Sequence, residues 1–315
     1  MIAYLVRRLF IAVVVILGIM LVTFLLLHNA EGNPAKDVLG TKATPQAIAA
    51  FSKAHGFDLP AWRQFVDYVN QNVHGNFGYS FKLNQSVVSL FKENAGRSAL
   101  LSGASLLLSI LLAIPLGIYA GLKRNSLYDY TSTTLSFVFY SVPLFLVSLA
   151  AIDVFALKLN WLPFEASQSD SVIGVIKQAN TMILPTACLV AVSLAAYSRY
   201  MRSSALDNLA QDYVKVARAK GLSERAVLLR HLLRNCCLPM ITLIGLSIPD
   251  LLAGNLIVEQ VFNYPGLGLL FYNSLGTADY PILTAYTLVG GVLVVLGNLV
   301  ADVSLTIADP RVRLV

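Results

Sequence analysis

Six long apolar stretches constrain this chain more than any other feature of its sequence. They cover residues 10–27, 98–122, 130–152, 181–197, 236–258 and 282–301. Each is close to the ~20 residues that an α-helix needs to cross the hydrocarbon core of a bilayer. Backbone polar groups in lipid have to pair within their own segment, so such stretches form helices. The sequence therefore predicts an all-α integral membrane protein with six transmembrane helices.

The composition agrees with a chain solvated by lipid. Hydrophobic residues make up 57% of the sequence and charged residues 13%, a balance that excludes an ordinary soluble domain. The first stretch is open to interpretation as a secretory signal. It precedes HNAEGNP, however, which is a poor cleavage site, so we interpret it as a retained span.

The positive charges are distributed unevenly between the two faces of the membrane. Of the 23 Lys and Arg residues, 14 fall in the shorter segments of one face. These are Arg7, Arg8, Lys123, Arg124, Arg199, Arg202, Lys215, Arg218, Lys220, Arg225, Arg230, Arg234, Arg311 and Arg313. The positive-inside rule therefore predicts that both termini are cytoplasmic. This asymmetry accounts for the net charge of +6, so we expect no nucleic-acid partner.

The chain divides into three parts. An N-terminal span (1–28) precedes an extracytoplasmic loop subdomain (29–97) and a core of five spans (98–315), which contains a cytoplasmic loop at 201–235. Cys188, Cys236 and Cys237 lie in or beside spans, so the sequence predicts no extracytoplasmic disulfide.

The extracytoplasmic subdomain contains two segments, TPQAIAAFSKAHG and PAWRQFVDYVNQNVHG, that end at glycine and predict short helices. In the second, Trp62, Phe65, Val66 and Val69 recur at helical spacing. This apolar face packs either on the tops of the spans or on a delivery protein.

Four prolines, Pro115, Pro143, Pro239 and Pro249, fall inside the apolar stretches. A proline lacks the backbone donor and bends a helix unless neighbours compensate. Bent spans suit a pathway that opens and closes, although proline is also commoner in membrane helices generally.

The cytoplasmic loop is long, basic and partly amphipathic. It predicts a helix that ends at Gly221 and a second helix that begins after Ser223. Ala217 and Gly221 are four residues apart and form a small-residue face, which basic residues flank. The loop either covers the ends of its own spans or docks on a cytoplasmic partner.

The residues of this loop resemble the EAA loop of ABC importer permeases, in the version found in peptide permeases. The matching positions are Asp212, Tyr213, Ala217, Arg218, Ala219, Lys220, Gly221, His231, Leu238 and Pro239. Further blocks appear in order along the chain: YLVRRLF, GNPA, GFDLPAWRQFVDYV, HGNFGYSF, VFNYPGLGLL, DYP and ADPRVR. The chain is identified as a member of the B-type permeases of dipeptide, oligopeptide, glutathione and nickel uptake systems. It departs from the family pattern at Lys215, Val216, Asn33, Asn76 and Tyr264.

The resemblance implies a type I ABC importer permease in the plasma membrane of a bacterium or archaeon. It implies a homologous second permease, two ATPase subunits that bind ATP and Mg²⁺, and an extracytoplasmic binding protein. The residues from Asp212 to Gly221 would couple ATP hydrolysis to the spans. The cargo class that the resemblance implies is peptides, with nickel chelates, glutathione or haem as alternatives.

Motifs for chemistry are absent from the sequence itself. No GxxxxGK[ST] occurs, so the chain cannot cradle a nucleotide phosphate, and no HExxH or nucleophile elbow occurs either. We therefore expect no enzyme activity, no cofactor and no metal in this chain.

Polar residues in and near the fifth span are the candidate pathway residues. Asp250, Asn255, Glu259 and Tyr264 form this set. Asp250 meets the cargo or contacts another subunit, because a carboxylate in a span usually faces water or a partner. Glu259 and Tyr264 line the mouth of the pathway, or belong to a lid packed on the second permease. A rival function is a proton-coupled secondary transporter with Asp250 and Asp302 as proton carriers, but the sequence gives no sign of the internal repeats and broken helices typical of that class.

Overall fold

The computed structural model describes residues 2–29, 34–40 and 43–308. The sequence blocks at 32–35 and 308–313 lie partly or wholly outside these ranges, as do Asn33, Arg311 and Arg313. Within the described residues the only strands are those of one short hairpin, β1 (Tyr79–Ser80) and β2 (Gln85–Ser86), and every other regular element is a helix. The all-α prediction is confirmed.

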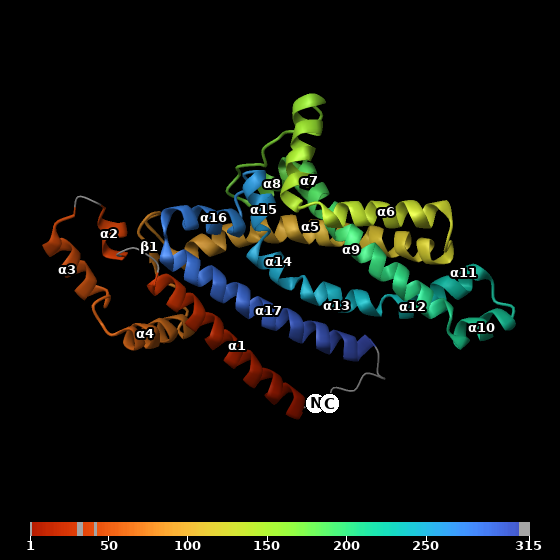
Figure 1. The fold of residues 1–315 in the computed structure, drawn as a ribbon, viewed down its shortest axis with the longest axis horizontal. Helices are drawn as coiled ribbons and strands as arrows, with labels where there is room; N and C mark the ends of the chain where they lie inside the picture. The colour runs from red at the N-terminus through yellow and green to blue at the C-terminus, as the bar shows by residue number, and fades with distance from the viewer. Residues whose placement is uncertain (1, 30–33, 41–42, 309–315) are drawn as a thin grey trace.

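Four helices are each long and apolar enough to cross a membrane unbroken, and the number rises to six if two bent pairs are counted as one span each. The four are α1 (Ile2–His28), α5 (Val87–Leu122), α9 (Ile183–Leu209) and α17 (Tyr280–Ala308). They run roughly along the long axis of the molecule (Figure 1). Four of the six predicted spans are therefore unbroken helices, and the third is a bent pair. The second bent pair, 224–246, runs from the predicted loop at 201–235 into the fifth stretch.

The third span bends by 101° between two helical segments. Its parts are α6 (Leu127–Ser141), α7 (Leu144–Ala151) and the π-helix η1 (Ile152–Lys158). Val142 is extended, with φ −81° and ψ 126°, because Pro143 excludes the helical conformation from the residue before it. Pro115, by contrast, lies within α5 without interrupting it.

The fifth apolar stretch is divided into three short helices: α13 (Leu238–Leu246), α14 (Ile248–Ala253) and α15 (Leu256–Val261). Pro249 stands at the start of α14, and Gly254 ends it with φ 82°, a conformation that favours glycine. An interruption beside Pro249 agrees with the bend that a proline inside a span predicts. No broken helix was expected from the sequence, however, and the break at Gly254 differs from that expectation.

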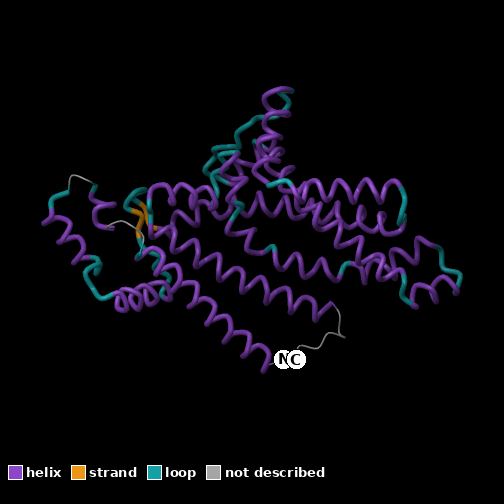
Figure 2. Tube along the Cα trace, viewed as in Figure 1, coloured by secondary structure: helices purple, strands orange, loops and turns teal. Residues whose placement is uncertain are grey.

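Two groups of short helices lie at opposite ends of the bundle. The group at one end contains α2 (Pro34–Leu39), α3 (Pro45–Ala54) and α4 (Ala61–Val73), from the predicted extracytoplasmic subdomain, and α16 (Leu267–Thr277). Two further short elements, α8 (Val172–Lys177) and η2 (Ala179–Met182), precede α9. The other group contains α10 (Asp212–Ala219), α11 (Glu224–Ala226), η3 (Val227–Leu232) and α12 (Leu233–Cys236). Figure 2 shows that loops connect these short elements while the bundle between them is helical.

α5 and α9 pack against each other, and they approach closely near their C-terminal ends because small residues lie in this contact. A Cβ atom built on Gly117 would lie 2.5 Å from both the Met201 Cβ and the Ser198 carbonyl oxygen, and one on Gly121 would lie 2.8 Å from the Ala205 Cβ. Glycine at these positions lets the two backbones approach, as in many membrane helix pairs.

The two terminal helices lie side by side. Arg8 near the start of α1 pairs with Asp302 near the end of α17 at 2.9 Å, so the helices are antiparallel. At the opposite end of the molecule, Ser80 of β1 donates a hydrogen bond to the Asp279 carboxylate just before α17. Burial raises the pKa of Asp279. These contacts attach the hairpin and α1 to the last span.

Candidate coupling loop and pathway residues

The loop predicted to couple with a partner folds as two helical segments joined at glycine. α10 spans the first segment, and Gly221 ends it with φ 77°. The Ser223 hydroxyl then accepts from the Ala226 N–H at 3.4 Å and begins α11. The helix-glycine-helix prediction is confirmed, and the loop projects beyond the bundle at the end opposite α3 (Figure 1).

One face of α10 is buried in the chain's own core. Val214 is fully buried and Ala217 is 4% exposed, and both pack with Met201, Val227 and Leu232. Ala217 therefore contributes packing inside the subunit rather than surface. The small-residue face inferred from its spacing to Gly221 does not form, because Ala217 points inward and Gly221 lies in the open.

The exposed side of the loop combines basic and apolar groups. Val216 is 51% exposed and Leu222 is 37% exposed, and Ala219 and Lys220 lie between them in the sequence. A Cβ atom at Gly221 would meet nothing within 4 Å. A cytoplasmic partner would thus meet the surface formed by Val216, Ala219, Lys220, Gly221 and Leu222, which we call the loop surface. Residues 214 and 217 are buried and residue 216 is exposed, as the helical period requires. This period is the feature of the sequence from which the exposed surface could have been predicted.

Charged residues brace the loop internally. Arg218 forms a two-pronged ion pair with Glu224 at 2.8 and 3.0 Å, which joins α10 to α11. The Lys215 ammonium donates to Asp212 at 2.9 Å, and this contact lowers the pKa of the Asp212 carboxyl. Tyr213 donates to Asn208 at 2.8 Å. Tyr213 and Arg218 therefore make contacts within the loop, while the side chains of Asp212 and Arg218 also stay open to a partner, at 91% and 44% exposed.

An ion pair links the C-terminal part of α9, which leads into this loop, to α6. The Arg202 Nε and Nη2 donate to the two Asp129 carboxylate oxygens at 2.5 and 2.8 Å, and Asp129 is only 3% exposed. The Asn125 N–H donates to it as well, at 3.0 Å. Sequence reasoning missed this pair, since Arg202 was counted only as a positive charge and Asp129 precedes its apolar stretch.

The four candidate pathway residues separate into one exposed group and three buried or partly buried ones. Asp250 lies on the exposed side of α14, near Tyr197, whose hydroxyl bonds to that of Ser247 at 2.9 Å. Asn255 caps α15 by accepting from the Val258 N–H at 3.2 Å. Its side chain is thus engaged within the chain.

Glu259 is fully buried and is the centre of a hydrogen-bond cluster. Its Oε1 accepts from the Ser98 hydroxyl at 2.8 Å and the Asn255 N–H at 3.2 Å. Its Oε2 accepts from the N–H groups of Gly268 at 2.7 Å and Leu269 at 3.1 Å, at the start of α16. A carboxylate is stabilised at a helix N-terminus, where backbone donors are otherwise unpaired. Glu259 therefore joins α5, α15 and α16.

Tyr264 is also fully buried and packs beside this cluster. Its hydroxyl donates to the Arg97 carbonyl oxygen at 2.7 Å, and its N–H donates to the Glu259 carbonyl oxygen at 2.7 Å. The segment around Tyr264 was predicted either to line the mouth of the pathway or to form a packed lid. Its contacts within this chain favour a packing role over a surface that meets cargo.

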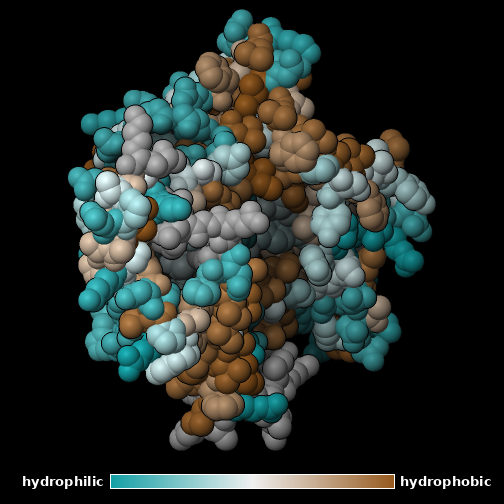
Figure 3. Space-filling model, turned by 60° about the vertical axis from the view of Figure 1, so that its left-hand side comes forward, coloured by the Kyte–Doolittle hydropathy of each residue, from teal (hydrophilic) through white to brown (hydrophobic). Residues whose placement is uncertain are grey.

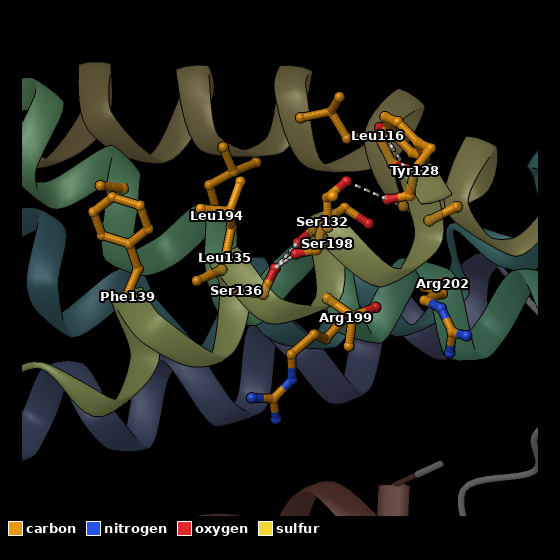
Figure 4. Close-up of a pocket in the computed structure, with 16 residues that line it drawn as sticks. Leu116, Tyr128, Ser132, Leu135, Ser136, Phe139, Leu194, Ser198, Arg199 and Arg202 are labelled. Carbon is orange, nitrogen blue, oxygen red and sulfur yellow. Dashed lines mark hydrogen bonds between the residues drawn. The ribbon is translucent and has the colours of Figure 1, made fainter. Parts of the chain in front are cut away.

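A cavity of about 360 Å³ lies between α5, α6 and α9. Its wall is mostly apolar, with hydroxyl groups from Ser132, Ser136 and Ser198, and the last two bond at 3.3 Å (Figure 4). Arg199 extends away from these serines in this view, and its guanidinium lies 4.9 and 4.8 Å from the ring centroids of Phe137 and Tyr140. No cluster of His, Cys, Asp and Glu able to hold a metal ion occurs among the described residues.

Two family models match almost the whole chain. The model described as "Binding-protein-dependent transport system inner membrane component" matches residues 113–314, and its N-terminal counterpart matches residues 1–98.

Curated relatives match over nearly their full length. The oligopeptide transport system permease protein AppB of Bacillus subtilis is 35% identical over 99% of this chain and 100% of its own. A putative peptide permease protein of Brucella suis is 34% identical, and the dipeptide transport system permease protein DppB of Escherichia coli is 31% identical, each over 99% of both chains. The predicted resemblance is thereby confirmed: this chain belongs to the binding-protein-dependent, multi-pass membrane permeases of ABC importers, in the dipeptide and oligopeptide family.

Proposed function

We propose that this chain is one of two homologous permeases of an ATP-driven peptide importer. The second permease, two ATPase subunits and an extracytoplasmic binding protein complete the complex. ATP and Mg²⁺ are held by the ATPases, because this sequence has no phosphate-binding loop. The match along the full length of permeases named for peptides supports the peptide class.

The observation that carries the coupling role is the loop surface. Exposed Val216 and Leu222 surround an open Gly221 on a segment whose other face is buried in the core. ATP binding moves the ATPases together, and a rigid loop transmits that movement to α9, which continues directly into it. The Arg202–Asp129 pair passes the movement on to α6. The pathway then alternates between outward and inward access.

The test adds a charge to the loop surface. Val216→Asp would place a carboxylate against the partner, and an unpaired charge in a contact is costly. We expect ATPase affinity to fall at least ~10-fold, which corresponds to ~1.4 kcal/mol, with normal membrane insertion. Leu83→Asp is the matched control, since Leu83 is 50% exposed on the hairpin at the other end.

Co-purification of the ATPases and cargo-stimulated ATP hydrolysis are the two measurements. A Val216→Asp complex that assembles and hydrolyses ATP like the Leu83→Asp complex would contradict the coupling role. A ligand screen on the cognate binding protein tests the cargo separately. Binding of peptides supports the proposed cargo class. Exclusive binding of nickel chelates, glutathione or haem would contradict that class and would leave the coupling role unaffected.

A further inference from the structure

The helix α4 leaves an apolar surface that the subunit itself covers only in part. Phe65 and Tyr68 pack on α1, with ring centroids 5.5 and 6.3 Å from that of Phe24. Trp62, Val66 and Val73 remain 65%, 55% and 76% exposed. Polar residues occupy the opposite side of the helix, so α4 is amphipathic with half of its apolar face open.

A groove of about 340 Å³ separates α4 from α1. It is lined by Leu17, Phe65, Val66, Val69, Asn70 and Val73. Figure 1 shows α4 beside the half of α1 nearer its C-terminal end. The groove thus carries one polar group and no charge.

The position of Leu17 indicates what surrounds this groove. The most apolar part of α1 is Val6–Leu26. Its most apolar 18 residues have a mean hydropathy of 3.2, and only 11% of them are buried in the chain. Leu17 lies nine residues before its end, which is ~14 Å along a helix. One wall of the groove therefore lies within the hydrocarbon layer. In Figure 3 the left-hand side of the molecule as seen in Figure 1 is brought forward, and this face carries a broad apolar surface.

We infer that an acyl chain of a membrane phospholipid fills the groove between α1 and α4, and that α4 lies in the interface of that leaflet. In the proposed topology this is the outer leaflet. Trp62 stands at the first turn of α4 with the Arg63 guanidinium 5.5 Å from its ring, the aromatic and basic pair typical of the boundary between headgroups and acyl chains.

Lipid fits this lining better than a protein segment does. A peptide backbone would bring polar groups that the lone Asn70 cannot pair, at a cost for each one. Helix partners in membranes favour small residues at their contacts, whereas Leu, Phe and Val form these walls. The inference depends on the chain spanning a membrane and not on the cargo it carries.

Photolabelling of the complete permease complex tests the inference. The complex is placed in nanodiscs of phosphatidylethanolamine that carries a diazirine on its acyl chain, illuminated, and mapped for adducts by mass spectrometry. We expect adducts on Val66, Val69 and Val73 and near Leu17. Val13 and Val14, which are 48% and 52% exposed on α1, report general lipid contact.

Two tryptophan variants make the result specific to the groove. Val69→Trp fills it and should lower the adduct yield on α4 and at Leu17 severalfold, while Val13 stays labelled. Gln71→Trp adds the same ring to the polar side of α4 and should leave every yield unchanged. Leu17→Trp fills the groove from the other wall if Val69→Trp prevents assembly.

Two outcomes would overturn the inference. Adducts at Val13 with none on α4 would mean that a protein partner or water covers this helix. Equal α4 labelling in Val69→Trp and Gln71→Trp would mean that the chain does not enter the groove.

Discussion

At the scale of single residues, Glu259 explains the glycines on either side of it in the chain. A Cβ atom on Gly254 or Gly266 would collide with the Glu259 carboxylate, and one on Gly268 would lie 2.8 Å from the Leu256 backbone. Glycine is needed there because backbone donors have to approach the buried carboxylate closely. The acceptor and its donors thus form one unit that seals the turn between α15 and α16.

We predict that Glu259→Ala destabilises the permease far more than Tyr264→Phe. The first change leaves one hydroxyl and three backbone donors without their acceptor, and each unpaired buried group costs ~1–3 kcal/mol. The second removes one hydrogen bond, worth ~1 kcal/mol. The midpoint of thermal unfolding of the purified complex measures both. A Glu259→Ala complex of ordinary stability that loses only uptake would instead assign Glu259 to the pathway.

At the scale of elements, the crossing of α5 and α9 holds the coupling loop on the bundle. The loop continues from α9, and the close approach at Gly117 and Gly121 leaves little freedom for α9 to shift alone. Movement of the loop is therefore expected to displace α5 and α9 together. The bends in the third and fifth spans, at Pro143 and Gly254, are the places where the remaining segments change direction.

We predict that Gly117→Ala separates these helices and lowers stability by ~1–3 kcal/mol, as overpacking of a close contact does. Gly290→Ala is the matched control, because it lies in the helix α17 with nothing within 4 Å of the new Cβ. Thermal midpoints of the two variants should differ clearly, and ATP hydrolysis should become uncoupled from cargo in Gly117→Ala alone. Equal midpoints would show that the crossing tolerates the methyl group.

At the scale of the whole molecule, the two ends differ in their chemistry. One end carries the basic loop from Asp212 to Cys236, and the other carries α2, α3, α4 and the hairpin. The ion pair of Arg8 and Asp302 joins the first span to the last one. This polarity is what a subunit needs if it is to meet ATPases on one side and a binding protein on the other.

We predict that Lys220→Cys is protected and Lys53→Cys is modified when intact cells are treated with a membrane-impermeant thiol reagent. Both residues are exposed, one on the loop surface and one on α3. Cys188, Cys236 and Cys237 are first replaced by serine so that a single thiol is read. Modification of Lys220→Cys alone would invert the proposed orientation.

The sequence by itself determined the class, the number of apolar stretches, the helix-glycine-helix loop and the family. These depend on local composition and on motifs that are contiguous in the chain, such as the residues around Gly221. The same local view identified Glu259 and Tyr264 as unusual polar residues among apolar ones, but not their partners.

Only the tertiary structure decided which side each of these residues faces. Ser98 lies 161 residues before Glu259, and Asp129 lies 73 residues before Arg202, so no local pattern connects them. Ala217 is turned inward because the helical period of α10 is aligned with the core formed by Met201 and Leu232. Membrane helices are apolar all round, so the pattern of hydrophobic residues does not show which face packs, and that choice follows from close contacts between distant segments.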